Sequence, residues 1–209
     1  WRQSSDPPGP TLSPHLLALN FCRSQGIVTF SITCEFAMLR TLNSTILHSG
    51  ALLLALILIY TGISATEKIT WLMEVTPVII VVPLLLATVK RYPLTPLLYT
   101  LIFLHAIILM VGGMYTYAKV PVGFQVQEWL DLSRNPYDKL GHFFQGLVPA
   151  LTAREILVRG NIVRGRKMLA FLVCCVALAI SAMYELIEWW AALAMGQGAD
   201  DFLGTQGDP

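Results

Sequence analysis

The chain has 209 residues, of which 55% are hydrophobic and 13% are charged, with a net charge of +1. Because soluble domains carry about 25% charged residues, this composition excludes an ordinary soluble domain and indicates a membrane protein. Basic clusters interleaved with aromatic residues are absent, so we expect the lipid bilayer and not nucleic acid as the partner, and no protein partner is indicated.

Residues 1–37 differ from the rest of the chain. Their first part is rich in Pro, Ser and Gly, and polar residues interrupt the apolar stretches that follow. The chain begins with Trp1, whereas Met38 directly precedes a strong apolar run, as an initiator would. A secretory signal peptide is the competing interpretation, but no basic region leads into one compact apolar core. We therefore predict a non-native or disordered leader at residues 1–37 and a transmembrane helical domain at residues 38–209.

The remaining sequence contains apolar runs of the roughly 20 residues that cross a bilayer as a helix. The second run contains Pro77 and Pro83, which predict a kink. The fold class expected is all-α, a polytopic transmembrane helix bundle. The five predicted spans cover about 45–64, 69–89, 96–117, 137–158 and 168–195.

Basic residues near span ends predict the orientation, because such residues are retained on the cytoplasmic side. They precede the first span, join spans two and three, and join spans four and five, which are alternate loops: Arg40, Lys90, Arg91, Arg159, Arg164, Arg166 and Lys167. We therefore expect a multi-pass protein of the bacterial inner membrane with a cytoplasmic amino terminus.

Ionisable side chains are expected to gather at the outer end of the bundle. Asp138 and His142 begin the fourth span with an i, i+4 spacing that places them on one helix face. Glu185 and Glu188 lie near the outer end of the fifth span, and Glu74 enters the second span from the same side. Because the insertion free energy of a charge at mid-bilayer is unfavourable by about 3 kcal/mol, this cluster needs a physical explanation.

Three explanations remain open. The first is a divalent metal ion (Zn, Mn, Fe or Mg), because one imidazole and several carboxylates are suitable ligands. The second is a proton- or substrate-binding site, and the third is a packing cluster in which Lys139 or Arg134 neutralises the acids. The predicted metal ligands are Asp138, His142, Glu185 and Glu188, and the predicted substrate-binding residues are Glu74, Tyr115, Tyr137 and Lys139.

Other polar residues receive structural interpretations. Glu155 is expected to be a surface charge, and His105 a neutral imidazole bonded to a neighbouring helix. Gly112 and Gly113 predict a close approach of two helices, and the tyrosines that follow them, Tyr115 and Tyr117, suit an interfacial aromatic belt.

Several motifs then resemble one family. The segments GGMYTYAKVP, NPYDKLGHFFQGLVPALTAREIL, SAMYELIEWW and DDFLGTQGDP resemble the YjdF-like family of bacterial inner-membrane proteins from Met38 onward. That resemblance implies no established activity. It does imply a sixth span after the GTQGD segment, and Asp208 as the start of a further ligand set. The family often has a histidine where this chain has Met114, and the DKxxHF core at Asp138 also resembles the VanZ-like membrane proteins.

The leading functional hypothesis is an integral inner-membrane protein with an outward-facing carboxylate and histidine site. It would act as a metal-dependent enzyme on a lipid-linked or envelope substrate. No catalytic residue can be assigned, because the sequence lacks a nucleophile elbow, a phosphate-binding loop and an HExxH helix. A small proton- or cation-coupled transporter or permeability factor and a non-catalytic membrane partner protein are the alternatives.

Overall fold

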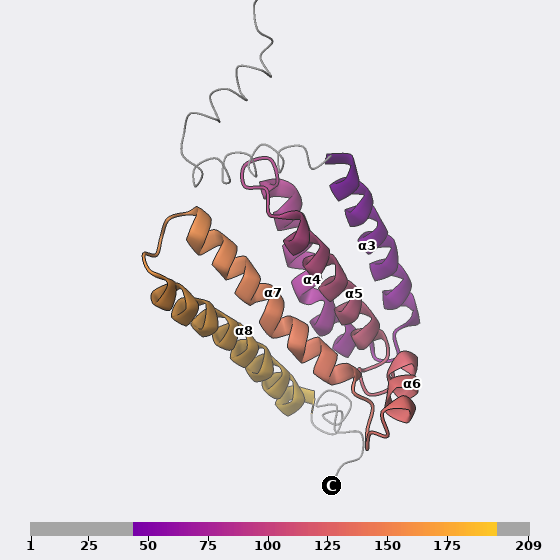
Figure 1. Cartoon of the computed structure of the whole chain (residues 1–209). Coiled ribbons are helices and arrows are strands. Elements are labelled where there is room, and N and C mark those ends of the chain that lie inside the picture. Colours follow the sequence, from indigo (N-terminus) through magenta and orange to yellow (C-terminus); the bar gives the residue numbers. More distant parts are fainter. Residues whose placement is uncertain (1–43, 196–209) are drawn as a thin grey trace, which may run out of the picture. The chain divides into compact units, whose positions relative to one another are not determined.

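The computed structural model describes residues 44–195, and every structural statement below refers to this part of the chain. Residues 1–37 and Asp208 lie outside the described residues, so the expectations for them stay predictions. The described elements are helices (Figure 1): α3 (Ser44–Ser64), α4 (Lys68–Thr88), α5 (Pro96–Met114), α6 (Pro121–Trp129), α7 (Tyr137–Arg159) and α8 (Arg166–Met195).

The predicted spans correspond to α3, α4, α5, α7 and α8. The largest difference is at the end of α5, which stops at Met114 and not at residue 117. Thr116 and Tyr117 adopt positive φ angles of 53° and 52°, a conformation that cannot continue a right-handed helix. α6, a nine-residue helix that begins at Pro121, was not predicted from the sequence.

Four of the described helices are long and apolar enough to cross a membrane: α3 from Leu47, α4, α5, and α8 as far as Ala194. The polytopic all-helical class is therefore confirmed. α7 does not meet the same hydropathy, because its sequence includes charged residues near both ends. It has 23 residues, about 34 Å at 1.5 Å per residue, and lies between α5 and α8 (Figure 1).

α5 occupies the centre of the bundle and packs against α3, α4 and α7, while α8 packs against α7. The buried core lies among α3, α4 and α5 and consists of Leu54, Val75, Val78, Ala106, Leu109 and Met110. Most other large apolar side chains of α3 and α8 are exposed, as expected of helices that face lipid.

The predicted close approach at the glycine pair is present. A Cβ added at Gly113 would lie 2.9 Å from the Cβ of Glu74 and 3.3 Å from the Cα of Trp71, so only glycine allows α4 and α5 this contact. His105, also on α5, lies beside the Phe144 ring with a centroid distance of 6.0 Å. Its Nε2 atom has no hydrogen-bond partner within the described residues, so the expected bond to a neighbouring helix is absent at that nitrogen.

The prediction that Glu155 is a surface charge was wrong. Its carboxylate is buried and accepts hydrogen bonds from the backbone N–H and the hydroxyl of Thr95, at 2.9 and 2.8 Å. Arg159, one helical turn later, pairs with Glu155 at 2.6 Å and also donates to the carbonyl of Pro93. The Arg159 guanidinium lies 4.2 Å from the centre of the Tyr92 ring. These contacts join the α4–α5 loop to the end of α7.

Candidate functional site

The start of α7 is held in place by a buried asparagine. The Asn135 amide donates to the carbonyls of Ala118 and Val120, at 3.1 and 3.0 Å, and its oxygen accepts from the backbone N–H of Tyr137 at 3.0 Å. Asn135 is only 1% exposed, so these bonds replace the water that its amide would otherwise bind. Asn135 thereby connects the loop after α5 to the first turn of α7, which carries Asp138.

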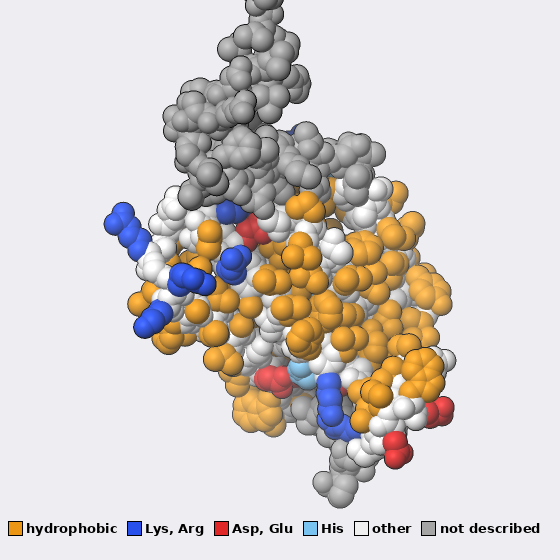
Figure 2. All heavy atoms as spheres, viewed as in Figure 1, with side chains coloured by type: hydrophobic (Ala, Val, Ile, Leu, Met, Phe, Trp, Pro, Cys, Tyr) orange, Lys and Arg blue, Asp and Glu red, His pale blue; other side chains and the backbone are white. Residues whose placement is uncertain are grey.

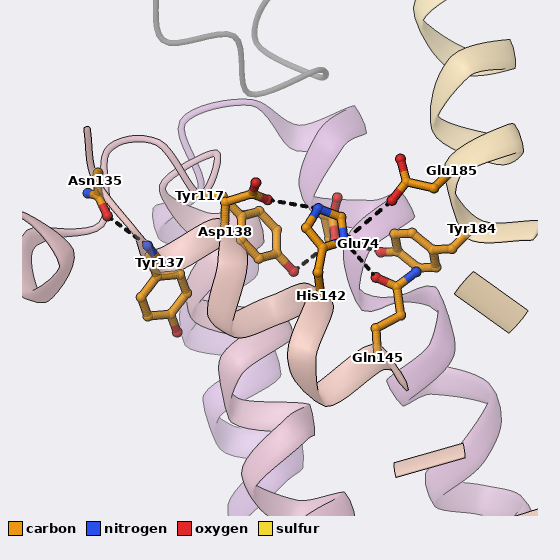
Figure 3. Close-up of polar contacts among 9 residues, drawn as sticks. All are labelled: Glu74, Tyr117, Asn135, Tyr137, Asp138, His142, Gln145, Tyr184 and Glu185. Carbon is orange, nitrogen blue, oxygen red and sulfur yellow. Dashed lines mark hydrogen bonds and ion pairs between the residues drawn. The ribbon is translucent and has the colours of Figure 1, made fainter. Parts of the chain in front are cut away.

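His142 lies between two carboxylates (Figure 3). Its Nε2 atom lies 3.3 Å from an oxygen of Asp138 on the same helix, and its Nδ1 atom lies 3.3 Å from an oxygen of Glu185 on α8. The predicted convergence of Asp138, His142 and Glu185 is therefore present in the structure. Carboxylate oxygens only accept hydrogen bonds when ionised, so the imidazole satisfies both neighbours only when both ring nitrogens carry a proton.

The imidazole is also within reach of a ligand from outside the bundle. The side chains of His142, Asp138 and Glu185 are 44%, 35% and 57% exposed. On the inner side, the oxygen of Gln145 lies 3.2 Å from His142 Nδ1. The amide nitrogen of Gln145 is buried and has no hydrogen-bond partner within the described residues, so it remains available as a donor.

Glu74 forms the buried part of the site. It is 4% exposed, and one of its oxygens accepts hydrogen bonds from the hydroxyls of Tyr184 at 2.6 Å and Tyr117 at 3.0 Å. The two tyrosines come from α8 and from the turn after α5, so the carboxyl group of α4 connects three segments (Figure 3). Such hydrogen bonds are the usual means of keeping a buried carboxyl group in a helix bundle.

Two glycines make room for the Tyr117 ring. A Cβ at Gly112 would lie 2.4 Å from this ring, and a Cβ at Gly141 would lie 2.9 Å from it. Burial, reinforced by the charge of Glu74, raises the pKa of Tyr117 well above its usual value. The hydroxyl therefore stays protonated at neutral pH and acts as the donor to Glu74.

Two other predicted site residues, Glu188 and Lys139, interact electrostatically with the site. Glu188 is half-buried on α8 and interacts electrostatically with Glu74, Glu185 and His142, although no direct bond joins it to them. Lys139 is exposed and interacts electrostatically with Asp138.

Neither of the two predicted substrate-binding tyrosines has a described bond to the imidazole. Tyr137 is 8% exposed and donates to the carbonyl of Ile108 on α5, so its hydroxyl points away from His142 (Figure 3). Tyr115 follows α5; its backbone N–H donates to carbonyls of the last helical turn, and its carbonyl accepts from the backbone N–H of Lys119.

A metal ion does not fit the described side chains as they lie. Within residues 44–195, no group of three His, Cys, Asp or Glu residues could hold one. The physical reason is the position of the ring: Asp138 and Glu185 contact opposite nitrogens of His142, so one ion could not take both carboxylates with the imidazole between them.

Comparison with known proteins supplies the family. Residues 46–209 match a family described as "Predicted membrane protein (DUF2238)". The chain is also 87% identical over 171 residues to a protein of Escherichia coli (strain K12) named "Inner membrane protein YjdF", an alignment that covers 82% of each chain. The chain belongs to this family. It is an integral, multi-pass protein of the inner membrane, as predicted, and no solved structure matches it.

Three residues of the site were not predicted from the sequence to belong to it: Tyr184, Gln145 and Tyr117. Tyr184 precedes Glu188 by four residues, and Gln145 follows His142 by one helical turn, so helical spacing could have suggested both. Tyr117 was assigned only to an interfacial belt. Its contact with Glu74 depends on the positive φ angle of Tyr117 and on the space at Gly112 and Gly141, which no local sequence pattern indicates.

Proposed function

We propose that the protein is a membrane enzyme in which His142 transfers protons to or from a lipid-linked or envelope substrate. The observation that supports this proposal is the half-exposed imidazole held between Asp138 and Glu185. Asp138 orients the ring through Nε2, as a carboxylate does for a catalytic histidine in other enzymes, and a substrate group that took the place of Glu185 at Nδ1 would exchange the Nδ1 proton with the imidazole.

We further propose that this end of the bundle faces outward. The connections at the other end carry the basic residues Lys90, Arg91, Arg164, Arg166 and Lys167, which favour the cytoplasmic side. In Figure 2, Lys and Arg side chains gather over the α7–α8 connection, while acidic and histidine side chains appear at the opposite end beside further Lys or Arg side chains. A substrate would accordingly approach from the outer leaflet.

The test compares His142→Ala with His48→Ala, the same substitution on α3, whose side chain is exposed and plays no part in the site. Each variant is expressed at equal level in bacteria that lack their own relative, and lipid and envelope extracts are compared by mass spectrometry. A lipid or envelope compound that the unchanged protein and His48→Ala form or consume should be converted at least about 100-fold less by His142→Ala. This factor is the smallest usual contribution of acid–base catalysis.

Two outcomes would overturn the enzyme proposal. In the first, His142→Ala changes the extracts as much as the unchanged protein does. In the second, no species responds to any variant, and His142→Ala only lowers the stability of the purified protein. The second result would assign the cluster to helix packing and favour the non-catalytic partner protein.

A second candidate function is a proton- or cation-coupled transporter, which the buried Glu74 favours. A carboxyl group held by two tyrosine hydroxyls next to an imidazole can take up and release a proton within the bundle. Proteoliposomes that contain a pH-sensitive dye would show a proton flux that Glu74→Gln abolishes. A flux unchanged by Glu74→Gln, or no flux at all, excludes this candidate.

Divalent metal binding at the same site remains a proposal with its own measurement. Asp138 and Glu185 already lie close to His142, but an ion would have to displace the ring from between them. Metal analysis of the purified protein and of His142→Ala tests this. One equivalent of Zn, Mn, Fe or Mg that is lost in the variant supports the metal, and equal, substoichiometric contents contradict it.

A further inference from the structure

α6 occupies a defined place at the end of the bundle. It lies in the connection between α5 and α7, at the end that also carries the candidate site (Figure 1). The buried Gly123 is the contact point: a Cβ there would lie 1.9 Å from the side-chain oxygen of Asn135. Because Asn135 also bonds the backbone of Val120 directly before α6, the helix is attached to the start of α7 at a fixed depth.

The remaining surface of α6 carries large apolar side chains that the protein does not cover. Val122 is 52% exposed and Trp129 is 80% exposed, and Leu130 directly after the helix is 64% exposed. At about 100° per residue Val122 and Trp129 lie within about 20° of each other, whereas the exposed Glu128 lies about 100–120° from them and Leu130 lies on the side of the buried Gly123. Phe124, 45% exposed, flanks Glu128. Figure 2 shows hydrophobic side chains gathered over α6 with acidic ones beside them.

Lipid is the occupant that best fits this surface. The protein is embedded in a bilayer, and in Figure 2 exposed hydrophobic side chains extend over the bundle as far as α6. A helix attached at the level where the spans end lies at the depth of the lipid headgroups. Tryptophan is enriched at that depth, because its ring is apolar and its N–H can still bond to water or headgroups.

We propose that α6 is an interfacial helix that lies on the membrane surface with Val122 and Trp129 inserted among the lipid headgroups. Because Asn135 connects α6 to the first turn of α7, this contact would also set the depth of Asp138 and His142 relative to the bilayer. The inference does not depend on which chemical reaction, if any, the site performs.

The experiment uses the full chain with its four cysteines (Cys22, Cys34, Cys174 and Cys175) replaced by serine and reconstituted in phosphatidylethanolamine and phosphatidylglycerol vesicles. Single nitroxide labels are placed by Val122→Cys, Trp129→Cys, Gln125→Cys and Glu128→Cys. Collisions with oxygen, which concentrates in lipid, are compared with collisions with a water-soluble nickel chelate. The oxygen-to-chelate ratio should be severalfold higher for Val122→Cys and Trp129→Cys than for Glu128→Cys, with Gln125→Cys between them.

A label at Ile59, an exposed apolar residue of α3, provides the lipid-facing reference. Equal ratios at Val122, Trp129 and Glu128 would overturn the proposal. Spin–spin broadening at Trp129→Cys that disappears on dilution with unlabelled protein would show that a second copy covers α6 instead. Protection of the Val122 and Trp129 labels from both reagents would show that protein, not lipid, covers this face, and would also overturn it.

Discussion

Replacing Tyr184 with Phe removes one hydroxyl and keeps the ring. That hydroxyl donates a 2.6 Å hydrogen bond to Glu74, whose side chain is buried among α4, α5 and α8. After Tyr184→Phe, Glu74 keeps only the 3.0 Å bond from Tyr117. The substitution therefore tests whether the contact between α8 and α4 at this end of the bundle contributes to stability.

The size of the effect follows from burial and from the surrounding solvent. Hydrogen bonds to charged groups contribute about 1.5–3 kcal/mol in soluble proteins. Between membrane helices the average is lower, about 0.6 kcal/mol with a maximum near 1.7, because the unfolded state in the membrane also finds partners. The bond is short and its acceptor is 4% exposed, so we expect Tyr184→Phe to lower the free energy of unfolding by about 1–2 kcal/mol.

The assay is reversible unfolding of the purified full chain in mixed detergent micelles, followed by circular dichroism. Tyr60→Phe on α3 is the matched control, because its side chain is 64% exposed on the apolar surface of a span. Repeating Tyr184→Phe in a Glu74→Gln background measures the coupling between the two side chains. If Tyr184→Phe costs no more than Tyr60→Phe, or the same with and without Glu74→Gln, the argument for this hydrogen bond is refuted.

Three further predictions concern the fold. Gly113→Ala should destabilise the protein by about 1–3 kcal/mol in the same assay, because its Cβ would overlap α4. A Cβ at Gly146 would have no atom within 4 Å, so Gly146→Ala should be neutral or stabilise the protein by up to about 1 kcal/mol. Equal effects of Gly113→Ala and Gly146→Ala on stability would contradict the packing argument. Asn135→Ala should raise amide exchange in α6 more than in α5, since it removes the bonds that attach α6; unchanged exchange in α6 would count against this role. Reporter fusions after Arg91 and Lys167 should behave as cytoplasmic, and an external signal at Lys167 would reverse the proposed orientation.

Much of the site could be predicted because helix geometry converts spacing into position. Asp138 and His142 share a face by their i, i+4 spacing, and the antiparallel run of α7 and α8 brings Glu185 to the same end. The metal role assigned to these residues could not be decided in this way. Spacing determines which side chains meet, but not that the His142 ring would lie between the two carboxylates.

The sequence by itself determined the membrane class, the approximate ends of the spans and the depth of the acidic residues, because these properties depend on hydropathy and on a constant rise per residue. Only the tertiary structure decided which partner each buried polar group has. Glu155 looked like a surface charge until the α4–α5 loop supplied Thr95, and Tyr117 looked like an interfacial anchor until a positive φ turned its hydroxyl to Glu74. Such contacts join residues distant in sequence, and in an apolar surrounding the cost of an unpaired polar group selects them.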